Sequence, residues 1–412
     1  MIDQAPLRVA FTNISRRLWA GGYNYQSNLF TALNRYCPGE IVPVIFAGMS
    51  DDSAELAALS QIPGVEIVQS PTFDRRRSSL FVALAFGIDR SAAAEFRAKR
   101  IDLVFEAARF FGWRLPFPTV AWFPDFQHSR LPQLFSLAAR WRRDFGFRAQ
   151  IASGRSIMLS SESALRDYRK FYPSSADDVS VVRFATQPAP GLLTANPSDV
   201  LAQYSLPPGY FYLPNQFWRH KNHQVVVDAL AVLKKRGFDV VVAASGSPHD
   251  PREPDHFDGL MRQVKDRGLE MNFRYLGMIP SDHVYALLRT SLALINPSRF
   301  EGWSTTVEEA KSFGVPMILS DVDVHREQTG GAARYFGIDD PEMLADHLSE
   351  VSQLAGPAVA RDLLPNLDER VGAFAMDFAH VIKNAVESSR RAARTPNAAS
   401  GTTAKIESPR RE

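Results

Sequence analysis

The chain of 412 residues has a single cysteine, Cys37, and no apolar run long enough to cross a bilayer. One cysteine cannot form an internal disulfide, which fits a reducing compartment. The longest apolar run, residues 80–88, falls far short of the roughly 20 residues of a spanning helix. The net charge of +2 gives no general electrostatic basis for binding nucleic acid. Because the N-terminus also lacks a signal-peptide pattern, we expect a soluble, cytoplasmic protein.

Short β-branched runs alternate with helical patterns along the chain, which predicts parallel sheets covered by helices. The pattern restarts after residues 187–209, a stretch rich in Pro, Gly, Asn and Ser. We therefore expect an α/β protein with two doubly wound, Rossmann-like domains. The predicted parts are a first domain at 1–190, a linker at 191–208, a second domain at 209–365, a final helix at 366–389 and a disordered tail at 390–412.

The most informative segment is NPSRFEGWSTTVEEAKSFGVPMILSD, residues 296–321. Thr305 and Glu308 fit a capping box, so a helix should begin near Thr305. Gly314 and Pro316 should end it. A predicted strand at 291–296 precedes this helix, so residues 302–306 form a strand-to-helix turn. Free N–H groups and the helix dipole make such a turn suited to a phosphate.

Two glutamates, Glu301 and Glu309, flank this predicted anion site. An ionised carboxylate repels a phosphate but accepts hydrogen bonds from hydroxyls. The pair is therefore suited to polyols on the two sides of a diphosphate, and a molecule of that kind is a nucleotide sugar. The alternative is that Glu301 is a solvated loop residue and Glu309 a helix-surface residue, and spacing alone leaves both interpretations open.

The same segment resembles the E-x7-E pattern of a large retaining glycosyltransferase family, glycosyltransferase family 4 or "glycosyl transferases group 1". That pattern is roughly P-S-x-x-E-G-[FW]-[GS]-x-x-x-x-E-A-x-x-x-G-x-P, and residues 297–316 contain each element. The following SDVDVHRE resembles the family's S-D-x-x-x-x-x-E and ends at Glu327. The resemblance implies the GT-B fold, in which a C-terminal helix crosses back to the first of two Rossmann-like domains.

The resemblance also implies roles for single residues. Glu309 would hold the ribose and Glu301 would contact the donor sugar. The loop that approaches the sugar and the diphosphate would consist of Gly302, Trp303, Ser304 and Thr305.

The segment LPNQFWRHKNH, residues 213–223, resembles the family's G-R-x-x-x-x-K-N, in which Arg and Lys neutralise the donor diphosphate. Lys221 and Asn222 match, whereas Gln216 stands at the Arg position. Arg219 is therefore a candidate for the second cation, and an ordinary basic loop is the alternative. A cation here would stabilise the charge that develops on the leaving nucleoside diphosphate.

Two segments of the first domain also resemble the family. In LWAGGYNYQ, residues 18–26, Gly21 and Gly22 resemble a glycine loop that approaches the donor phosphate or the acceptor. In WFPDFQHSRLPQLFS, residues 122–136, Pro124 stands where relatives often have His. Asp125 and His128 remain acceptor-side candidates, with a structural role as the alternative for His128.

We expect neither a metal nor a cofactor apart from the nucleotide-sugar substrate. Asp321 and Asp323 form a D-x-D motif, but it follows the strand after the nucleotide helix, and residues 249–258 read as a solvated loop without metal-ligand spacing. DRRRSSLFVALAFGIDR, residues 74–90, joins three arginines to an apolar stretch. It could dock on the inner face of an anionic membrane, or it could form a buried helix with a basic cap.

The sequence and the resemblance together predict a retaining, metal-independent glycosyltransferase that moves a sugar from a nucleotide-sugar donor to the hydroxyl of a glycan or lipid-linked acceptor. Synthesis of cell-surface polysaccharide or lipopolysaccharide is the pathway expected by family analogy. The donor phosphate would help to take the proton. Two other functions stay open. One is a nucleotide-sugar epimerase. The other is a non-catalytic subunit that binds a nucleotide sugar, and the departures from the family pattern at Pro124 and Gln216 favour that alternative.

Overall fold

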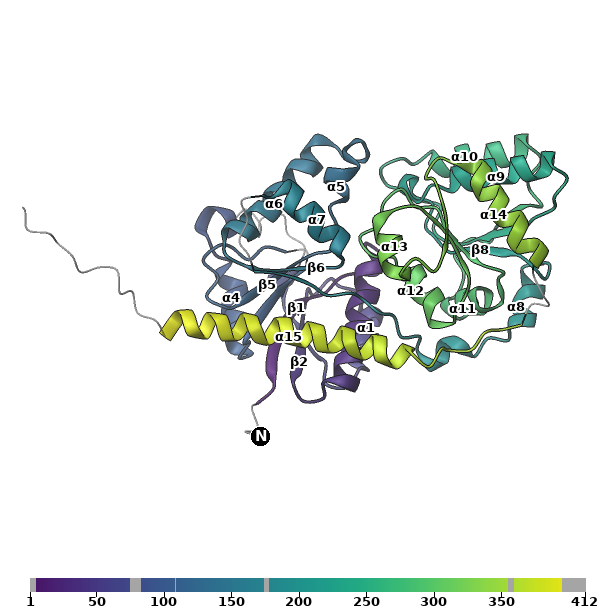
Figure 1. Ribbon diagram of the computed structural model, residues 1–412. Coiled ribbons are helices and arrows are strands. Elements are labelled where there is room, and N and C mark those ends of the chain that lie inside the picture. Colours follow the sequence, from purple (N-terminus) through teal and green to yellow (C-terminus); the bar gives the residue numbers. More distant parts are fainter. Residues whose placement is uncertain (1–4, 75–82, 108, 174–177, 355–358, 395–412) are drawn as a thin grey trace, which may run out of the picture.

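The computed structural model describes residues 5–74, 83–107, 109–173, 178–354 and 359–394, and these form two parallel sheets with helices packed around each (Figure 1). The first sheet has the order β3-β2-β1-β4-β5-β6-β7 and the second has the order β10-β9-β8-β11-β12-β13. Neighbouring strands pair in parallel in both. The expectation of two doubly wound α/β domains is therefore confirmed.

The strands of the first sheet are β1 (Leu7–Thr12), β2 (Ile41–Ala47), β3 (Glu66–Gln69), β4 (Leu103–Glu106), β5 (Thr119–Phe123), β6 (Ser156–Leu159) and β7 (Val179–Val181). Those of the second sheet are β8 (Phe211–Leu213), β9 (Val242–Ala244), β10 (Phe273–Tyr275), β11 (Leu294–Asn296), β12 (Met317–Ser320) and β13 (Arg334–Phe336). The sequence predicts all of these except β13, a three-residue strand at the edge of its sheet.

The helices before the second sheet are α1 (Ala20–Tyr36), α2 (Ser53–Ser60), η1 (Pro71–Phe73), α4 (Arg90–Ala98), α5 (Gln127–Arg130), η2 (Pro132–Leu134), α6 (Leu137–Ala152), α7 (Glu162–Phe171), η3 (Pro190–Leu193) and α8 (Pro197–Gln203). The later helices are η4 (Arg219–Lys221), α9 (His223–Lys235), α10 (His256–Asp266), α11 (Ser281–Thr290), α12 (Thr305–Ser312), α13 (Asp323–Thr329), α14 (Pro341–Leu354) and α15 (Leu367–Arg394).

Helix α15 crosses back from the second domain to the first (Figure 1). Its apolar face enters the core of the first domain, where the ring of Phe378 lies against those of Phe11 and Phe105. This is the crossover helix that the resemblance implies. The helix continues to Arg394, five residues into the stretch expected to be a disordered tail, and residues 395–412 lie outside the described part of the chain.

The segment expected to be a linker contains α8 and packs on the second domain. Val200 and Leu206 are buried in one apolar cluster with Tyr285 and Leu288 of α11. Although the segment is rich in turn-forming residues, it contains a short helix. Asn196 caps that helix, and its side chain accepts a hydrogen bond from the amide of Ser198.

In the part of the chain that the structure describes, no helix has both the length and the apolar character needed to cross a membrane. Residues 75–82, about the first half of the segment expected to dock on a membrane or to form a buried helix, lie outside the described residues.

Candidate active site

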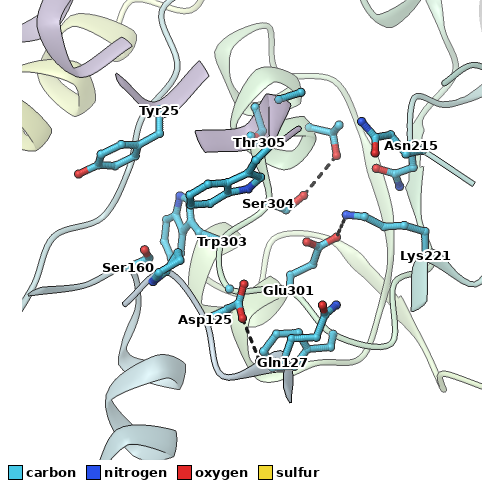
Figure 2. A pocket seen from close by; sticks show the side chains of 18 of the residues that line it. Tyr25, Asp125, Gln127, Ser160, Asn215, Lys221, Glu301, Trp303, Ser304 and Thr305 are labelled. Carbon is cyan, nitrogen blue, oxygen red and sulfur yellow. Dashed lines mark hydrogen bonds and ion pairs between the residues drawn. The ribbon is translucent and has the colours of Figure 1, made fainter. Parts of the chain in front are cut away.

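A cavity of about 260 Å³ lies between the two domains, at the carboxyl ends of their strands (Figure 2). Loops that follow β1, β5, β8 and β11 contribute to its wall. Strand order reverses between β1 and β4 and between β8 and β11, and such switch points are where open α/β sheets bind ligands. The predicted site residues that border this cavity are Gly21, Asp125, Lys221, Glu301, Gly302, Trp303, Ser304 and Thr305.

Lys221 and Glu301 form an ion pair at the wall of the cavity (Figure 2). Lys221 Nζ donates to Glu301 Oε1 at 2.6 Å, and Ser298 Oγ donates to the same oxygen at 2.7 Å. Burial acts to raise the pKa of Glu301, but the Lys221 ammonium and the Ser298 hydroxyl outweigh it and lower the pKa to about 2. Glu301 is therefore a fixed anion at neutral pH.

A buried polar network holds the loop between β11 and α12. Asn296, the last residue of β11, is fully buried; its Oδ1 accepts from the backbone amide of Ser298 at 3.3 Å and its Nδ2 donates to Ser304 Oγ at 2.9 Å. The amide of Ser304 donates to Gln328 Oε1 at 2.9 Å. Since a satisfied buried network fixes its members, the loop that carries Glu301 has a defined position.

Helix α12 begins at Thr305 as predicted, but the proposed capping box is wrong. Ser304 occupies the N-cap position. The carboxylate of Glu308 instead binds two cations, Lys311 at 2.9 Å and Arg370 of α15 at 2.7 Å. A nearly buried carboxylate gains more from two cations than from one amide. The first-turn amides thus keep no intrahelical acceptor, which is the property that suits an anion.

Glu309 lies one turn further into α12 than Thr305, on the same side of the helix. The hydroxyl of Tyr285 donates to Glu309 Oε1 at 3.3 Å. Burial raises the pKa of Glu309 to about 7, against the opposing effect of that hydrogen bond. Thr305 borders the cavity and Glu309 does not, among the residues described, so Glu309 lies behind the helix N-terminus.

The two predicted glycines lie in the first turn of α1, where a loop was expected. Gly21 borders the cavity. Gly22 lies under the ring of Trp19, and a Cβ on it would come within 2.4 Å of that ring. Gly22 therefore serves the packing of the Trp19 side chain.

Of the two acceptor-side candidates, the structure brings Asp125 to the cavity and places His128 in the interior. Asp125 Oδ1 accepts from the amide of Gln127 at 2.9 Å and lies 3.3 Å from Arg143 Nη2. His128 is only 2% exposed, its ring packs edge-on against Phe147, and burial lowers its pKa to about 4. The geometry therefore supports the structural alternative for His128.

Arg219 also lies away from the cavity, in a position that does not fit a second cation for the diphosphate. Its side chain is 57% exposed and pairs with Glu253 at 2.5 Å. Arg252 lies closer: it contacts Gln127 at 3.5 Å and His220 at 3.3 Å, and both of these border the cavity. The loop at 249–258, expected to be solvated, contains a buried carboxylate, Asp250, that holds Arg252.

Several polar residues of the cavity wall were not among the predicted site residues. Asn215 follows β8, Ser160 follows β6 and Gln127 opens α5. Only the position of these residues after predicted strands could have identified them, because residues just after parallel strands line the crevice. Gln216, at the position of the missing Arg, also borders the cavity.

Among the described residues, no group of three or more His, Cys, Asp and Glu side chains could hold a metal ion. The two aspartates of the D-x-D motif form ion pairs, Asp321 with Arg326 at 2.6 Å and Asp323 with Arg166 at 3.0 Å. Both pairs are exposed on the surface.

A second cavity, of about 610 Å³, adjoins the first and shares Trp19, Asp125 and Trp218 with it. Apolar side chains including Phe110, Phe135 and Phe147 make up part of its wall. The arginines that line it are Arg109, Arg142, Arg143 and Arg252. The described wall is thus both apolar and basic.

The contacts that join the domains beside the cavities include three that involve Gly302, Trp303 and Glu327. A Cβ on Gly302 would lie 2.3 Å from the carbonyl oxygen of Pro124, so only glycine allows this approach. Trp303 Nε1 donates to the carbonyl of Phe184 at 2.7 Å. Glu327 accepts from the amides of Glu162 and Ser163, at 2.9 and 3.1 Å, and so holds the N-terminus of α7.

Comparison with known proteins shows which family the second domain resembles. Residues 207–360 match the family model described as "Glycosyl transferases group 1". The O-antigen chain mannosyltransferase B of Escherichia coli is 29% identical over 97 residues, which are 23% of this chain and 26% of that protein. The O-antigen chain mannosyltransferase RfbU of Salmonella typhimurium is 24% identical over 185 residues, 43% of this chain and 50% of that protein.

The chain thus spans about a quarter and about half of the lengths of these two relatives. The crystal structure of Anabaena Alr3699/HepE in complex with UDP-glucose resembles nearly the whole chain, with a TM-score of 0.62. The match covers 93% of this chain and 100% of that one, at 15% identity, a level that shows the fold alone. The second domain is thus similar to the glycosyl transferases group 1 family, and the two domains with their crossover helix have the GT-B fold.

Proposed function

We propose that this protein is a glycosyltransferase that moves a sugar from a nucleotide sugar to an acceptor hydroxyl, with retention and without a metal. The observation that carries the proposal is the Lys221–Glu301 pair beside the N-terminus of α12, in a cavity between two domains. A cation, a helix N-terminus and a fixed carboxylate at one site suit a molecule in which a diphosphate is joined to polyols. The UDP-glucose complex of Anabaena HepE supports a donor of that class.

In this proposal, different residues bind different parts of the nucleotide-sugar donor. The first-turn amides of α12 and the Lys221 ammonium bind the diphosphate and stabilise its charge as the glycosidic bond breaks. Glu301 accepts from hydroxyls of the donor sugar, and Glu309 accepts from the ribose. The positive charge of Lys221 and of the helix end takes the place that a metal has in other transferases.

Asp125 lies at the junction of the two cavities, where the acceptor hydroxyl has to meet the donor. The larger cavity would hold the acceptor, and its arginines and phenylalanines suit a molecule with both an anionic and an apolar part. The donor phosphate takes the proton of the attacking hydroxyl. The two O-antigen mannosyltransferase relatives support a role in cell-surface polysaccharide synthesis.

The test is release of nucleoside diphosphate from UDP-, GDP-, ADP- and dTDP-sugars in the presence of a chelator. We expect slow release from one donor that is lost in Glu301→Gln and in Lys221→Ala. Lys235→Ala, an exposed lysine at the end of α9, is the matched control and should keep the activity. A protein that is unchanged by Glu301→Gln would contradict the proposal. An epimeric nucleotide sugar formed without acceptor would indicate an epimerase instead.

A further inference from the structure

The outer face of α6 carries a row of exposed apolar side chains. Leu137, Trp141 and Phe145 follow one another at intervals of four residues and are 71%, 74% and 52% exposed. Side chains at that spacing lie on one side of a helix. A contiguous exposed apolar row of this kind marks an interaction surface, since single large apolar residues are normally scattered.

Basic side chains accompany this row. The α6 sequence, LAARWRRDFGFRAQIA, has arginines at 140, 142, 143 and 148 and one acidic residue, Asp144. The Asp144 carboxylate is already bound by Arg148 Nε and by the hydroxyl of Tyr172, both at 2.8 Å. By helical position, Arg140 and Arg142 flank the row of Leu137, Trp141 and Phe145 on its two sides, and Arg148 lies at the end of the row, one turn after Phe145. The surface that fits α6 is therefore apolar in its centre and anionic around it.

We propose that α6 docks the first domain on an anionic lipid bilayer. A helix with Trp, Phe and Leu on one side and arginines beside them lies in the plane of the interface, with its apolar row among the acyl chains and its arginines at the headgroups. Each such arginine adds attraction only where the partner surface is negative. Charge complementarity thus selects an anionic bilayer as the occupant.

The position of α6 in the fold gives the docking a consequence. In Figure 1, α6 lies on the side of the first sheet away from α15. Its inner residues Ala139, Arg143 and Phe147 line the 610 Å³ cavity. A bilayer bound to the outer face of α6 would therefore lie within one helix thickness of that cavity. The docking itself needs no enzymatic activity and does not rest on the proposed function.

Vesicle co-sedimentation tests the proposal on the full chain. The protein is mixed with phosphatidylcholine vesicles that do or do not contain phosphatidylglycerol. We expect binding to the anionic vesicles and its loss at high salt, because exposed charges are screened. The variant Trp141→Ser/Phe145→Ser should lower the partition constant at least about tenfold, since it removes most of the apolar area of the row.

The matched control is Met271→Ser/Met278→Ser, which removes two side chains that are 70% and 71% exposed on the second domain. It should bind as the wild type does. Unchanged circular dichroism and melting temperature would show that both variants fold. Equal binding of the Trp141→Ser/Phe145→Ser variant and the wild type, or no binding of the wild type to anionic vesicles, overturns the proposal. So does a wild-type dimer in sedimentation velocity that the variant abolishes, because the row then belongs to a second copy.

Discussion

Removing the Lys221 side chain should destabilise the protein more than removing both members of its ion pair. The side chains of Lys221 and Glu301 are only 15% and 9% exposed. In Lys221→Ala the carboxylate of Glu301 stays buried and keeps Ser298 as a hydrogen-bond partner, but it loses the ammonium. Breaking a buried pair from one side costs about 3–5 kcal/mol, because it leaves an uncompensated charge.

The lowered pKa of Glu301 reports the net effect of Lys221 and Ser298 against burial. Lowering a carboxyl pKa from 4.5 to about 2 corresponds to about 3 kcal/mol of stability. Because the folded pKa lies below the unfolded one, this contribution is fully present above about pH 4.5. It is lost as the pH falls toward 2. The cost of Lys221→Ala at neutral pH should therefore be about 3 kcal/mol or more, because Lys221 is the largest of the effects that oppose burial.

The assay is urea unfolding at pH 7 of the wild type, Lys221→Ala, Glu301→Leu and the double variant Lys221→Ala/Glu301→Leu. We expect the double variant to be more stable than Lys221→Ala, since it removes the unpaired carboxylate. The gap between the wild type and Lys221→Ala should narrow below pH 4.5. A loss of less than about 1 kcal/mol in Lys221→Ala, or a double variant less stable than that single variant, would refute the reasoning.

Three further predictions concern the donor site and the domain interface. In the proposed function the Glu309 carboxylate accepts from a donor hydroxyl. Burial raises the pKa of Glu309 to about 7, so this carboxylate forms as the pH rises through 7. Donor affinity measured by calorimetry should therefore rise from pH 6 to 8 in the wild type and stay level in Glu309→Gln. Gly302→Ala should lower turnover by up to about a hundredfold with little change in donor affinity, because the new Cβ meets the Pro124 carbonyl and parts the domains. Glu327→Gln should weaken domain closure by about 1 kcal/mol, visible as a larger radius of gyration in X-ray scattering; an unchanged radius would show that the α7 contact does not hold the domains.

The sequence predicted the fold well because alternating strand and helix patterns are local. It also placed Glu301 and Lys221 at one site, because both follow strands whose carboxyl ends meet at one edge of a sheet. The short edge strand β13 was not predicted, because three residues are too few to show an alternating pattern. Helix α8 was not predicted, because its segment has the composition of a linker.

The places where the structure departs from the local sequence pattern have one physical cause, the long-range partners of polar side chains. Glu308 fits a capping box by spacing, but Arg370, 62 residues away in the chain, holds its carboxylate. His128 reads as a loop residue, but α5 places it among the aromatic residues around Phe147. Arg219 could be a second cation by its position, yet Glu253 pairs with it from another loop. Local sequence patterns do not predict such contacts between residues far apart in the chain.

The contacts that hold the proposed donor site are largely different from the contacts that join the two domains. Asn296, Ser304 and the Lys221–Glu301 pair are held by bonds within the second domain, whereas Gly302 and Trp303 of the same loop contact the first domain. Asp125 belongs to the first domain and reaches the cavity only while the domains touch at Gly302. Variants that part the domains should therefore keep donor affinity and lose transfer. Variants within the second-domain network should lose both donor affinity and transfer. Measuring donor affinity and turnover for the same variant therefore shows whether a substitution has disturbed the second-domain network or the domain interface.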